Sequence, residues 1–387
     1  MPAAAPLKIL HSIGSLNHGG IEKWAVELLR RIDRSRFDMD FLVRTNDIGT
    51  YEGEIEKNGS RVIRCLQHRN LRKYPVNFAR AISQYGPYDI IHAHQHDFDG
   101  VTLWLAAKHQ IPVRISHSHN DYRHRVRKEG FPWRCYRSVS RRLIAQYATH
   151  RLAVSHSAGL DLFGENLTGD DKWEVVHYGI DLEPFSGSQY DRAKALWQMQ
   201  IPPESFVVGH VGRFVEQKNH AFLLDIARVL ICRDKAFHFV LIGDGPLRLP
   251  FEKEVQKYGL TQNFRIIPET MEVPAVMCSV MDAFLFPSIH EGLGQALIQA
   301  QAASLRCYAS STVPYEALVC PELVTVLGLA KGPTVWAEAI DAGRRSHEQK
   351  RPGRLTGPDV DINVTARRFS QIYLEAFEQC RSRKQAA

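Results

Sequence analysis

The sequence predicts an α/β protein of two doubly wound domains that face each other across a cleft, and three observations support this prediction. Its 387 residues exceed the length at which one hydrophobic core keeps growing, so two domains are expected. Strand and helix patterns alternate along most of the chain, as in parallel sheets with helices on both faces. The alternation breaks at the turn-forming run 178–187, where we place the joint between the domains.

The first half alternates short apolar runs with longer amphipathic ones. The predicted strands are 8–13, 39–43, 61–65, 89–93, 113–117 and 151–155, and the predicted helices are 21–32, 51–58, 76–84, 100–109 and a basic stretch after residue 120. Strands joined by helices in this way form a parallel sheet, because each crossover returns the chain to the same edge. We assign this domain to residues 1–184.

The second half repeats the pattern after a short helix. The predicted strands are 206–211, 238–242, 264–267, 283–286 and 307–309, and the predicted helices are 221–231, 247–258, 273–279 and 294–303. Residues 344–356 are predicted to form a polar loop, and the second domain is assigned to 185–362. The run 363–380 carries apolar residues at helical spacing, so it is predicted to be a helix that packs on another surface.

Composition is that of an ordinary soluble enzyme. Hydrophobic residues make up 44% and charged residues 24% of the chain, and no apolar run approaches the roughly 18 residues that span a bilayer. The first six residues lack the charged start and apolar run of a secretory signal, so we expect a cytoplasmic protein. Seven scattered cysteines without a C-x-x-C pair indicate reduced thiols, neither a disulfide framework nor structural zinc.

The net charge of +7 is concentrated in one segment. Eight basic residues lie between 123 and 142, with Phe131, Trp133 and Tyr136 among them. We interpret the segment as an amphipathic helix that rests on anionic lipid headgroups, which would attach the protein to the inner face of the membrane. The membrane-facing candidates are Arg123, Arg125, Arg127, Lys128 and Trp133. A solvated basic face is the alternative, and a nucleic-acid partner is not expected because no recognition motif accompanies the charge.

A glycine-containing turn follows the first predicted strand. Gly14 to Gly20 includes the pair Gly19 and Gly20 directly before a helix, where backbone N–H groups can bind anions. The turn is not G-x-G-x-x-G, and Arg44 follows the second strand where a nicotinamide-binding domain would place an acidic residue. We expect a ligand-binding loop, with a simple tight turn as the alternative.

Two cations follow the first strand of the second domain. Gly212 and Arg213 end the strand 206–211, and Lys218 lies five residues further on. Fixed positive charge there could hold a diphosphate and stabilise the negative charge that develops as a nucleotide leaves a sugar. An unrelated surface pair is the alternative. Gly243 and Gly245, after the next strand, are a weaker signal of close backbone approach to a ligand.

An acidic residue lies at the most informative strand-to-helix crossover. Residues 287–302 read P-S-I-H-E-G-L-G-Q-A-L-I-Q-A-Q-A, which places Glu291 just before a glycine turn and a helix. A carboxylate in this position is suited to bind sugar hydroxyls. Complementing the dipole of the helix is the alternative role.

Histidines follow two strands of the first domain. His92, His94 and His96 come at one strand end, and His117 and His119 at the next. Because alternate strand residues point to opposite faces, we expect only a subset on one side and therefore no metal site. Three D-x-D pairs, at 38–40, 97–99 and 359–361, are interpreted as accidental.

Taken in order, these segments resemble the retaining glycosyltransferases of family four and, more loosely, the members that build bacterial exopolysaccharides and capsules. The resemblance runs nearly end to end, through the Gly19-Gly20 loop, D-I-I-H-A-H at 89–94, S-H-S-H at 116–119, V-S-H-S at 154–157, Y-G-I-D at 178–181, Gly212-Arg213, Lys218, G-D-G-P at 243–246 and the segment 287–302. It implies the GT-B fold, in which two Rossmann-like domains face each other, with the helix 363–387 packed back on the first.

The resemblance also implies roles for individual residues. Arg213 and Lys218 would contact the donor phosphates and Glu291 the sugar hydroxyls. We expect His119 to position the sugar, and His94 and His117 to lie on the acceptor side or to help position the sugar. The donor-binding set is Gly19, Gly20, Gly212, Gly243, Gly245, Gly292, Leu293, Gly294, Gln295 and Gln299. Gln299 departs from the family, which has a second glutamate there for the nucleotide ribose.

The predicted activity is retaining transfer of a sugar from a nucleotide-diphosphate sugar, with uridine diphosphate preferred, to a saccharide or lipid-linked saccharide in surface polysaccharide synthesis. The nucleotide sugar is a co-substrate, and no cofactor or metal is expected to be required. A nucleotide-sugar epimerase or a phosphorylase of the same fold is one alternative. A degenerate binding or scaffold subunit is another, which the Gln299 departure favours.

Overall fold

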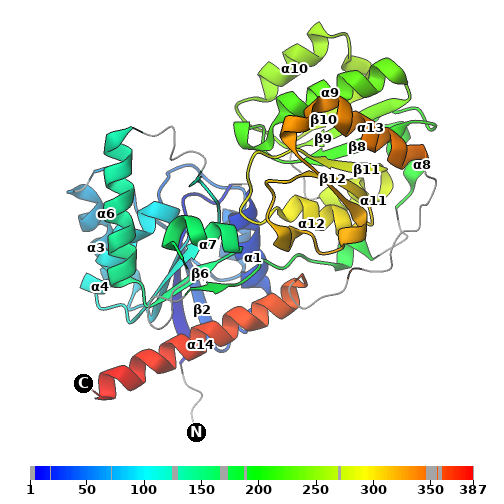
Figure 1. Ribbon diagram of the computed structural model, residues 1–387. Helices are drawn as coiled ribbons and strands as arrows, with labels where there is room; N and C mark the ends of the chain where they lie inside the picture. The colour runs from blue at the N-terminus through cyan, green and yellow to red at the C-terminus, as the bar shows by residue number, and fades with distance from the viewer. Residues whose placement is uncertain are drawn as a thin grey trace. The chain divides into compact units, whose positions relative to one another are not determined.

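The computed structural model describes residues 5–17, 19–70, 72–123, 130–165, 173–186, 190–268, 272–345, 355 and 360–386. The chain folds into two compact units (Figure 1). Unit 1 comprises Met1–Gly179 together with Pro358–Ala387, and unit 2 comprises Ile180–Gly357. The chain thus leaves unit 1 once and returns to it with its last helix.

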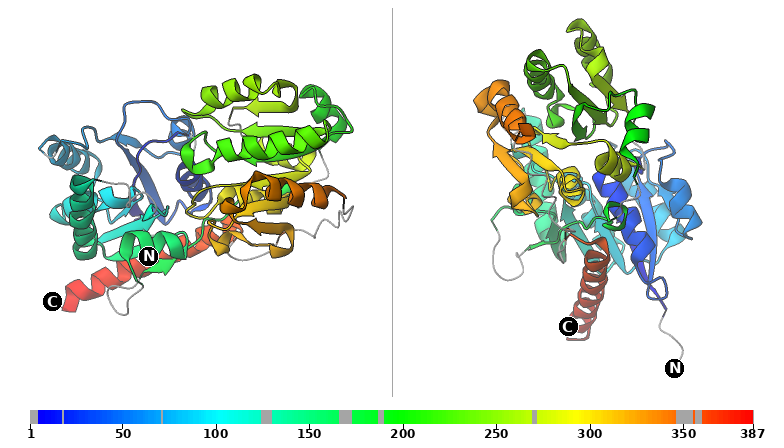
Figure 2. Two further views of the ribbon diagram at one scale, coloured as in Figure 1. Left: turned by 45° about the horizontal axis from the view of Figure 1, so that its top comes forward. Right: turned by 90° about the vertical axis from the view of Figure 1, so that its right-hand side faces the viewer.

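Unit 1 is built on a seven-stranded parallel sheet in the order β3-β2-β1-β4-β5-β6-β7. Its strands are β1 (Leu7–Ser12), β2 (Phe37–Val43), β3 (Val62–Arg64), β4 (Ile90–Ala93), β5 (Val113–Ser118), β6 (His150–Ala153) and β7 (Glu174–Val175). Its helices are α1 (Gly20–Arg31), α2 (Glu52–Lys57), α3 (Lys73–Tyr85), α4 (Asp99–Lys108), α6 (Phe131–Tyr147), α7 (His156–Phe163) and α14 (Ile362–Ala386). Helices lie on both faces of the sheet (Figure 2).

The two faces of this sheet have different chemistry because successive strand residues point to opposite sides. On one face Leu10, Leu42 and Ile91 pack with α3 and α4 in an apolar core. On the other face His11 and His92, partners in the β1–β4 register, contact aromatic side chains from α1 and α14. This second face holds the candidate site of unit 1.

Helix α14 belongs to the core of unit 1. Its buried Phe369 and Tyr373 rings lie against the histidine-bearing face of the sheet. Arg368 pairs with Glu174 of β7 at 2.6 Å. The apolar spacing of the final segment thus predicted a helix that packs on another surface, and the packing surface is this sheet.

Unit 2 is built on a six-stranded parallel sheet in the order β10-β9-β8-β11-β12-β13. Its strands are β8 (Phe206–Val211), β9 (Phe237–Ile242), β10 (Phe264–Ile267), β11 (Ala283–Phe286), β12 (Arg306–Ser310) and β13 (Val324–Leu327). Its helices are α8 (Arg192–Gln198), α9 (His220–Arg233), α10 (Arg248–Lys257), α11 (Val273–Ser279), α12 (Gln295–Ala302) and α13 (Gly332–Arg345). The predicted class, α/β with parallel sheets, is confirmed.

Four elements were not predicted. Strand β13 is a short edge strand with two exposed residues, so its apolar run is weak. Helix α13 begins at Gly332–Pro333, which resembles a turn, and it ends at Arg345 inside the predicted polar loop. Helix α7 and the two-residue strand β7 are short.

Among the described residues, no helix is long and apolar enough to cross a membrane.

Candidate functional site

In unit 2, Lys218 and Glu291 form an ion pair at the carboxyl ends of β8 and β11. Lys218 Nζ lies 2.6 Å from Glu291 Oε1, and both side chains are largely buried. Gln217 Nε2 donates to the His290 carbonyl at 3.0 Å and to Glu291 Oε2 at 3.5 Å. The Lys218 ammonium also lies over the Phe286 ring. Two residues 73 positions apart in the sequence are thus held together at one edge of the sheet.

Arg213 lies in the same turn as the lysine of this ion pair but has no partner of its own within the described ranges. Arg213 is exposed, and its guanidinium has no hydrogen bond or ion pair with the part of the chain that the structure describes. A Cβ on Gly212 would lie 3.1 Å from the Lys218 side chain, so the glycine gives the lysine room to lie across the strand end. A paired lysine and an unpaired arginine therefore adjoin the same turn.

Gly243 and Gly245 have φ values of 149° and 151°, which only glycine adopts readily. A Cβ at Gly243 would lie 2.2 Å from the Gly212 carbonyl oxygen, and one at Gly245 would lie 2.7 Å from the Phe214 oxygen. Their close approach is to the backbone of the Gly212–Phe214 turn, where Phe214 N–H donates to the Asp244 carbonyl. In the described structure these glycines pack on the Arg213 turn, and their approach to a ligand stays a prediction.

The Glu291 turn leads into α12 as predicted. Gly294 precedes the helix with a left-handed φ of 89°, and the Leu293 side chain is buried beneath the turn. Gly292 is also buried, whereas Gln295 and Gln299, on the helix itself, are partly exposed. In unit 1, Gly19 and Gly20 likewise lie at the start of α1, directly after β1 and its turn.

Five buried histidines of unit 1 cluster on one face of its sheet. His92 and His94 lie two residues apart on or just after β4, as do His117 and His119 on and after β5, so each pair points to the same side. As expected, the β4 segment sends only a subset of its three histidines to this face, since His96 lies apart, whereas the β5 segment sends both of its histidines there. His11, on β1, completes the cluster and was missed; its register with His92 could not be read from the sequence alone.

Hydrogen bonds link these rings. His11 Nδ1 is 2.9 Å from His94 Nε2, His94 Nδ1 is 2.8 Å from His119 Nε2, and His92 Nε2 is 3.2 Å from His117 Nδ1. Burial lowers the pKa of all five, to about 3 for His11 and His117. The imidazoles are therefore neutral at pH 7.

The hydrogen bonds and burial of His119, His94 and His117 limit the roles predicted for them. The second nitrogen of His119 is hydrogen-bonded to the Tyr178 hydroxyl, so both of its ring nitrogens are already engaged. His94 and His117 are buried beneath Trp24, which contacts both rings. His117 Nε2 is buried without a hydrogen-bond partner in the described structure. His96 lies apart and pairs with Asp161 at 3.0 Å.

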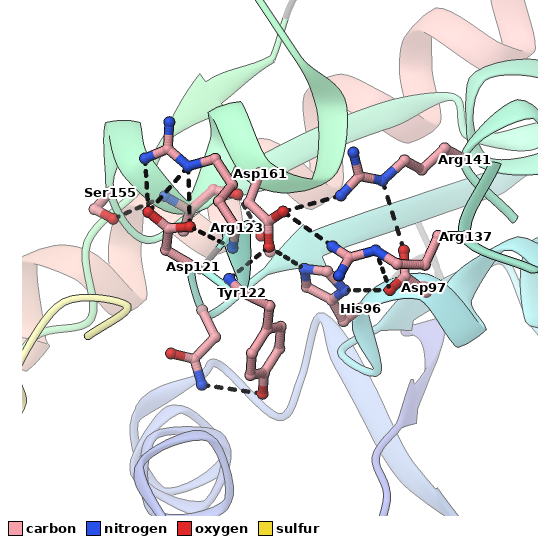
Figure 3. Close-up of polar contacts among 12 residues, drawn as sticks. His96, Asp97, Asp121, Tyr122, Arg123, Arg137, Arg141, Ser155 and Asp161 are labelled. Carbon is pink, nitrogen blue, oxygen red and sulfur yellow. Dashed lines mark hydrogen bonds and ion pairs between the residues drawn. The ribbon is translucent and has the colours of Figure 1, made fainter. Parts of the chain in front are cut away.

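The basic segment is anchored by Asp161 of α7 (Figure 3). Arg137 and Arg141 reach from α6 to Asp161 Oδ1, at 3.0 Å and 2.9 Å, and also to Asp97. Burial alone would raise the pKa of Asp161, but hydrogen bonds from His96 and the Tyr122 N–H, with the charge of Arg137, lower it to about 2. These arginines face inward and bind protein carboxylates.

The outer face of α6 exposes aromatic side chains, in contrast to the inner face with its paired arginines. Trp133 and Phe131 are exposed at 62% and 78%, which leaves large apolar rings in solvent beside basic residues. Arg123 pairs with Asp121 at 2.6 Å. Arg125, Arg127 and Lys128, the other predicted membrane-facing residues, lie outside the described residues.

The chain matches two family models that together cover most of its length. Residues 18–184 match the model described as Glycosyltransferase Family 4, and residues 191–343 match the model described as Glycosyl transferases group 1. The chain is 36% identical over 371 residues to EpsF of Bacillus subtilis (strain 168), a protein named as a glycosyltransferase; the match spans 93% of this chain and 94% of EpsF.

Other relatives are more distant. The capsular polysaccharide biosynthesis glycosyltransferase CapH of Staphylococcus aureus is 23% identical, over 95% of this chain and 99% of CapH. The Escherichia coli UDP-Gal:alpha-D-GlcNAc-diphosphoundecaprenol alpha-1,3-galactosyltransferase is 25% identical, over 58% of each chain. Among solved structures, Anabaena HepE in complex with UDP and glucose superimposes with a TM-score of 0.72 and 17% identity, over 98% of this chain and 100% of HepE.

Proposed function

This chain belongs to the family 4, group 1 glycosyltransferases, and we propose that it transfers a sugar from a UDP-sugar to a saccharide or lipid-linked saccharide acceptor with retention of configuration. The observation that carries the proposal is the Lys218–Glu291 pair beside the unpaired Arg213. The names of related proteins add support: HepE was solved with UDP and glucose, and the E. coli relative is named for a UDP-Gal donor and a diphosphoundecaprenol-linked acceptor.

The Lys218–Glu291 pair has free capacity for a donor. A lysine ammonium has three N–H donors, and only one is needed for Glu291, so two remain for phosphate oxygens. Glu291 has about four lone-pair sites, of which Lys218 and Gln217 occupy one each. The carboxylate can thus accept hydrogen bonds from sugar hydroxyls while its lysine partner faces the diphosphate.

In the proposed reaction, the acceptor hydroxyl attacks the sugar anomeric carbon from the face that the diphosphate leaves. The bond from that carbon to the β-phosphate oxygen breaks, a bond to the acceptor oxygen forms, and the acceptor proton passes to the departing phosphate. Arg213 and Lys218 stabilise the negative charge that develops on the diphosphate, and an enzymatic base is not needed. The N-terminal unit supplies the acceptor side of this proposal.

His119 is proposed to position the sugar, and its surroundings restrict how. A sugar hydroxyl would have to replace Tyr178 as the partner of His119 Nδ1, because Nε2 faces the buried His94. His94 and His117 lie too deep to meet an acceptor directly, and we propose that they act through His119.

A transfer assay with a matched pair of arginine variants tests the proposal. Wild-type protein is first screened with nucleotide sugars for thermal stabilisation, since a ligand that binds only the folded state raises stability. Arg213→Ala should then lower turnover by about 10²-fold, in the range measured for a lost charge-stabilising group. Arg228→Ala removes an exposed arginine from α9 of the same unit and should leave turnover unchanged.

Three results separate the alternatives. Unchanged turnover in Arg213→Ala would contradict the assigned role of this arginine. Binding of a UDP-sugar without transfer to any acceptor would favour the scaffold reading, for which Gln299 is the sequence argument. A change of the sugar itself without an acceptor would favour an epimerase, a reaction that the family matches do not favour.

We also propose that the outer face of α6 rests on an anionic membrane. Its exposed Phe131 and Trp133 lie beside basic residues, the combination found in helices that bind the lipid interface. Trp133→Ser should reduce co-sedimentation with vesicles that contain anionic lipid, and Trp197→Ser, which alters an exposed tryptophan of unit 2, should not. Equal sedimentation of both variants and the wild type would favour a solvated face.

A further inference from the structure

The five buried histidines of unit 1 form two overlapping groups of three. Within the described residues, one group is His11, His92 and His94, and the other is His94, His117 and His119. In each group, one ring nitrogen from every residue lies within 4.8 Å of the others. Sugar transfer as proposed above uses His119 directly and His94 and His117 only through it, and it gives no role to His11 and His92.

The second group combines one close pair of nitrogens with a third ring that has a nitrogen unpaired among the described residues. His94 Nδ1 and His119 Nε2 are 2.8 Å apart, and the ring centres of His117 and His119 are 4.1 Å apart. His117 Nε2 is fully buried and has no hydrogen-bond partner in the described structure. A buried nitrogen in this state calls for an explanation, because buried polar atoms are nearly always paired.

The opposite nitrogens of the same three rings all have partners. His94 Nε2 meets His11 at 2.9 Å, His117 Nδ1 meets His92 at 3.2 Å, and His119 Nδ1 meets the Tyr178 hydroxyl. Histidines that bind metals typically use their second nitrogen in this way, which fixes the ring and its tautomer. The first group also has one internal close pair, His11 with His94, but both nitrogens of its third member, His92, bond outside the group, to Tyr373 and His117.

We propose that His94, His117 and His119 bind one transition-metal ion of the Zn²⁺ type, with His11, His92 and Tyr178 as their outer partners. Three imidazoles without a carboxylate suit zinc, copper or nickel, whereas magnesium and calcium require oxygen ligands. Each ligand then carries its proton on the outer nitrogen and donates it to its partner. The ion would join the end of β4 to the end of β5 and leave a fourth position for water.

The close pair His94 and His119 requires only a small adjustment. Two nitrogens bound to tetrahedral zinc at about 2.0–2.1 Å lie about 3.3 Å apart, so His94 and His119 would separate by about 0.5 Å. Without an ion, the proton shared by His94 and His119 takes its place and His117 Nε2 stays unpaired.

Metal analysis of the full chain, made without a histidine tag, tests the proposal. The protein is stripped with a chelator, dialysed against Zn²⁺ and then against metal-free buffer, and its zinc is measured by mass spectrometry. About one ion per chain is expected, because the three ligands form a single site. The Co²⁺ form should show visible absorption of a nitrogen-ligated site and three shifted imidazole N–H signals in its proton NMR spectrum.

Variants identify the ligands. His117→Phe keeps a ring in this position, removes both the unpaired Nε2 and the Nδ1 that meets His92, and should lose the ion. His11→Phe should keep one ion with affinity lowered about 10–100-fold, as for a lost outer partner. His150→Gln, a partly buried histidine of β6 outside the cluster, should behave as wild type.

Thermal unfolding checks that each variant folds, and the Co²⁺ spectra of the wild type remain decisive if His117→Phe does not fold. No stoichiometric zinc in the wild type, or no shifted N–H signals in its Co²⁺ form, would overturn the proposal in favour of a metal-free hydrogen-bonded chain. Retention of zinc by His117→Phe together with its loss in His11→Phe would also overturn it, by assigning the ion to the first group. None of these readouts depends on transferase activity.

Discussion

Replacing Asp99 with asparagine should remove a pH dependence from the stability of unit 1. The Asp99 side chain is fully buried at the start of α4, where it accepts hydrogen bonds from Ser116 Oγ and the Gln95 N–H, both at 2.7 Å. Burial raises the pKa of Asp99 from 3.8 to about 7, against the opposing effect of those hydrogen bonds. The folded protein therefore holds a proton on Asp99 that the unfolded chain has released.

Because the pKa of Asp99 is higher in the folded protein than in the unfolded chain, the free energy of unfolding falls as the pH rises. The contribution of Asp99 to the free energy of unfolding is fully present below pH 3.8 and is lost as the pH rises to about 7. At about 1.4 kcal/mol per unit of pKa difference, the loss is about 4 kcal/mol. Asparagine resembles the protonated carboxyl group and does not titrate, so Asp99→Asn should gain about this much relative to wild type between pH 4 and pH 8.

Urea unfolding of both proteins at a series of pH values measures the difference directly. The buried histidines also titrate, but they affect both proteins equally and cancel when the two curves are subtracted. Asp225→Asn, which changes an exposed carboxylate on α9, should leave the difference from wild type constant with pH. A constant difference for Asp99→Asn as well would refute the reasoning, because it would mean that the folded protein keeps Asp99 ionised.

Three further predictions concern the donor unit and the basic helix. Gln299→Glu restores the charge typical of the family and should lower the KM for the nucleotide sugar about tenfold, the gain of a charged over a neutral hydrogen bond; an unchanged KM would place Gln299 away from the ribose. Gly243→Ala puts a Cβ 2.2 Å from the Gly212 oxygen and should lower the free energy of unfolding by about 2 kcal/mol or more, measured by urea; a neutral effect would contradict the close packing. Asp161→Asn removes one of the two carboxylates that pair with the buried guanidinium of Arg137, leaving Asp97 at 3.4 Å, and should lower the free energy of unfolding by about 1–3 kcal/mol, with faster hydrogen exchange in α6; protection equal to wild type would refute the anchoring role.

The alternation of apolar and amphipathic runs was sufficient to predict both sheets. Strands such as β8 and β9 are buried on both faces and read as continuous apolar runs, which is a strong signal. Edge strand β13 is half exposed, and α13 begins with a glycine and a proline, so neither has a clear periodic pattern. Elements without a continuous apolar or periodic run are therefore the ones that sequence patterns miss, whereas the edge strands β3 and β10 were predicted from their apolar runs.

Part of the candidate site could be predicted from the positions of its residues after strands. Glu291 and Lys218 each follow a strand, and parallel strands end at one edge of a sheet, so their proximity could be inferred. The contacts of Gly243 could not, because a glycine that packs on backbone and one that faces a ligand look alike in sequence. Asp161 was missed because its partners come from α6 and from the turn after β4, which only the fold brings together.

The return of the chain to unit 1 affects how the protein is made. The last 25-residue helix contributes Phe369 and Tyr373 to the interior of the unit that is translated first. Unit 2 is continuous and can fold as soon as it leaves the ribosome, whereas unit 1 must wait for its final helix. During that interval Trp24 and the histidine-bearing face are uncovered, so the part of the protein that emerges first is the last to be completed.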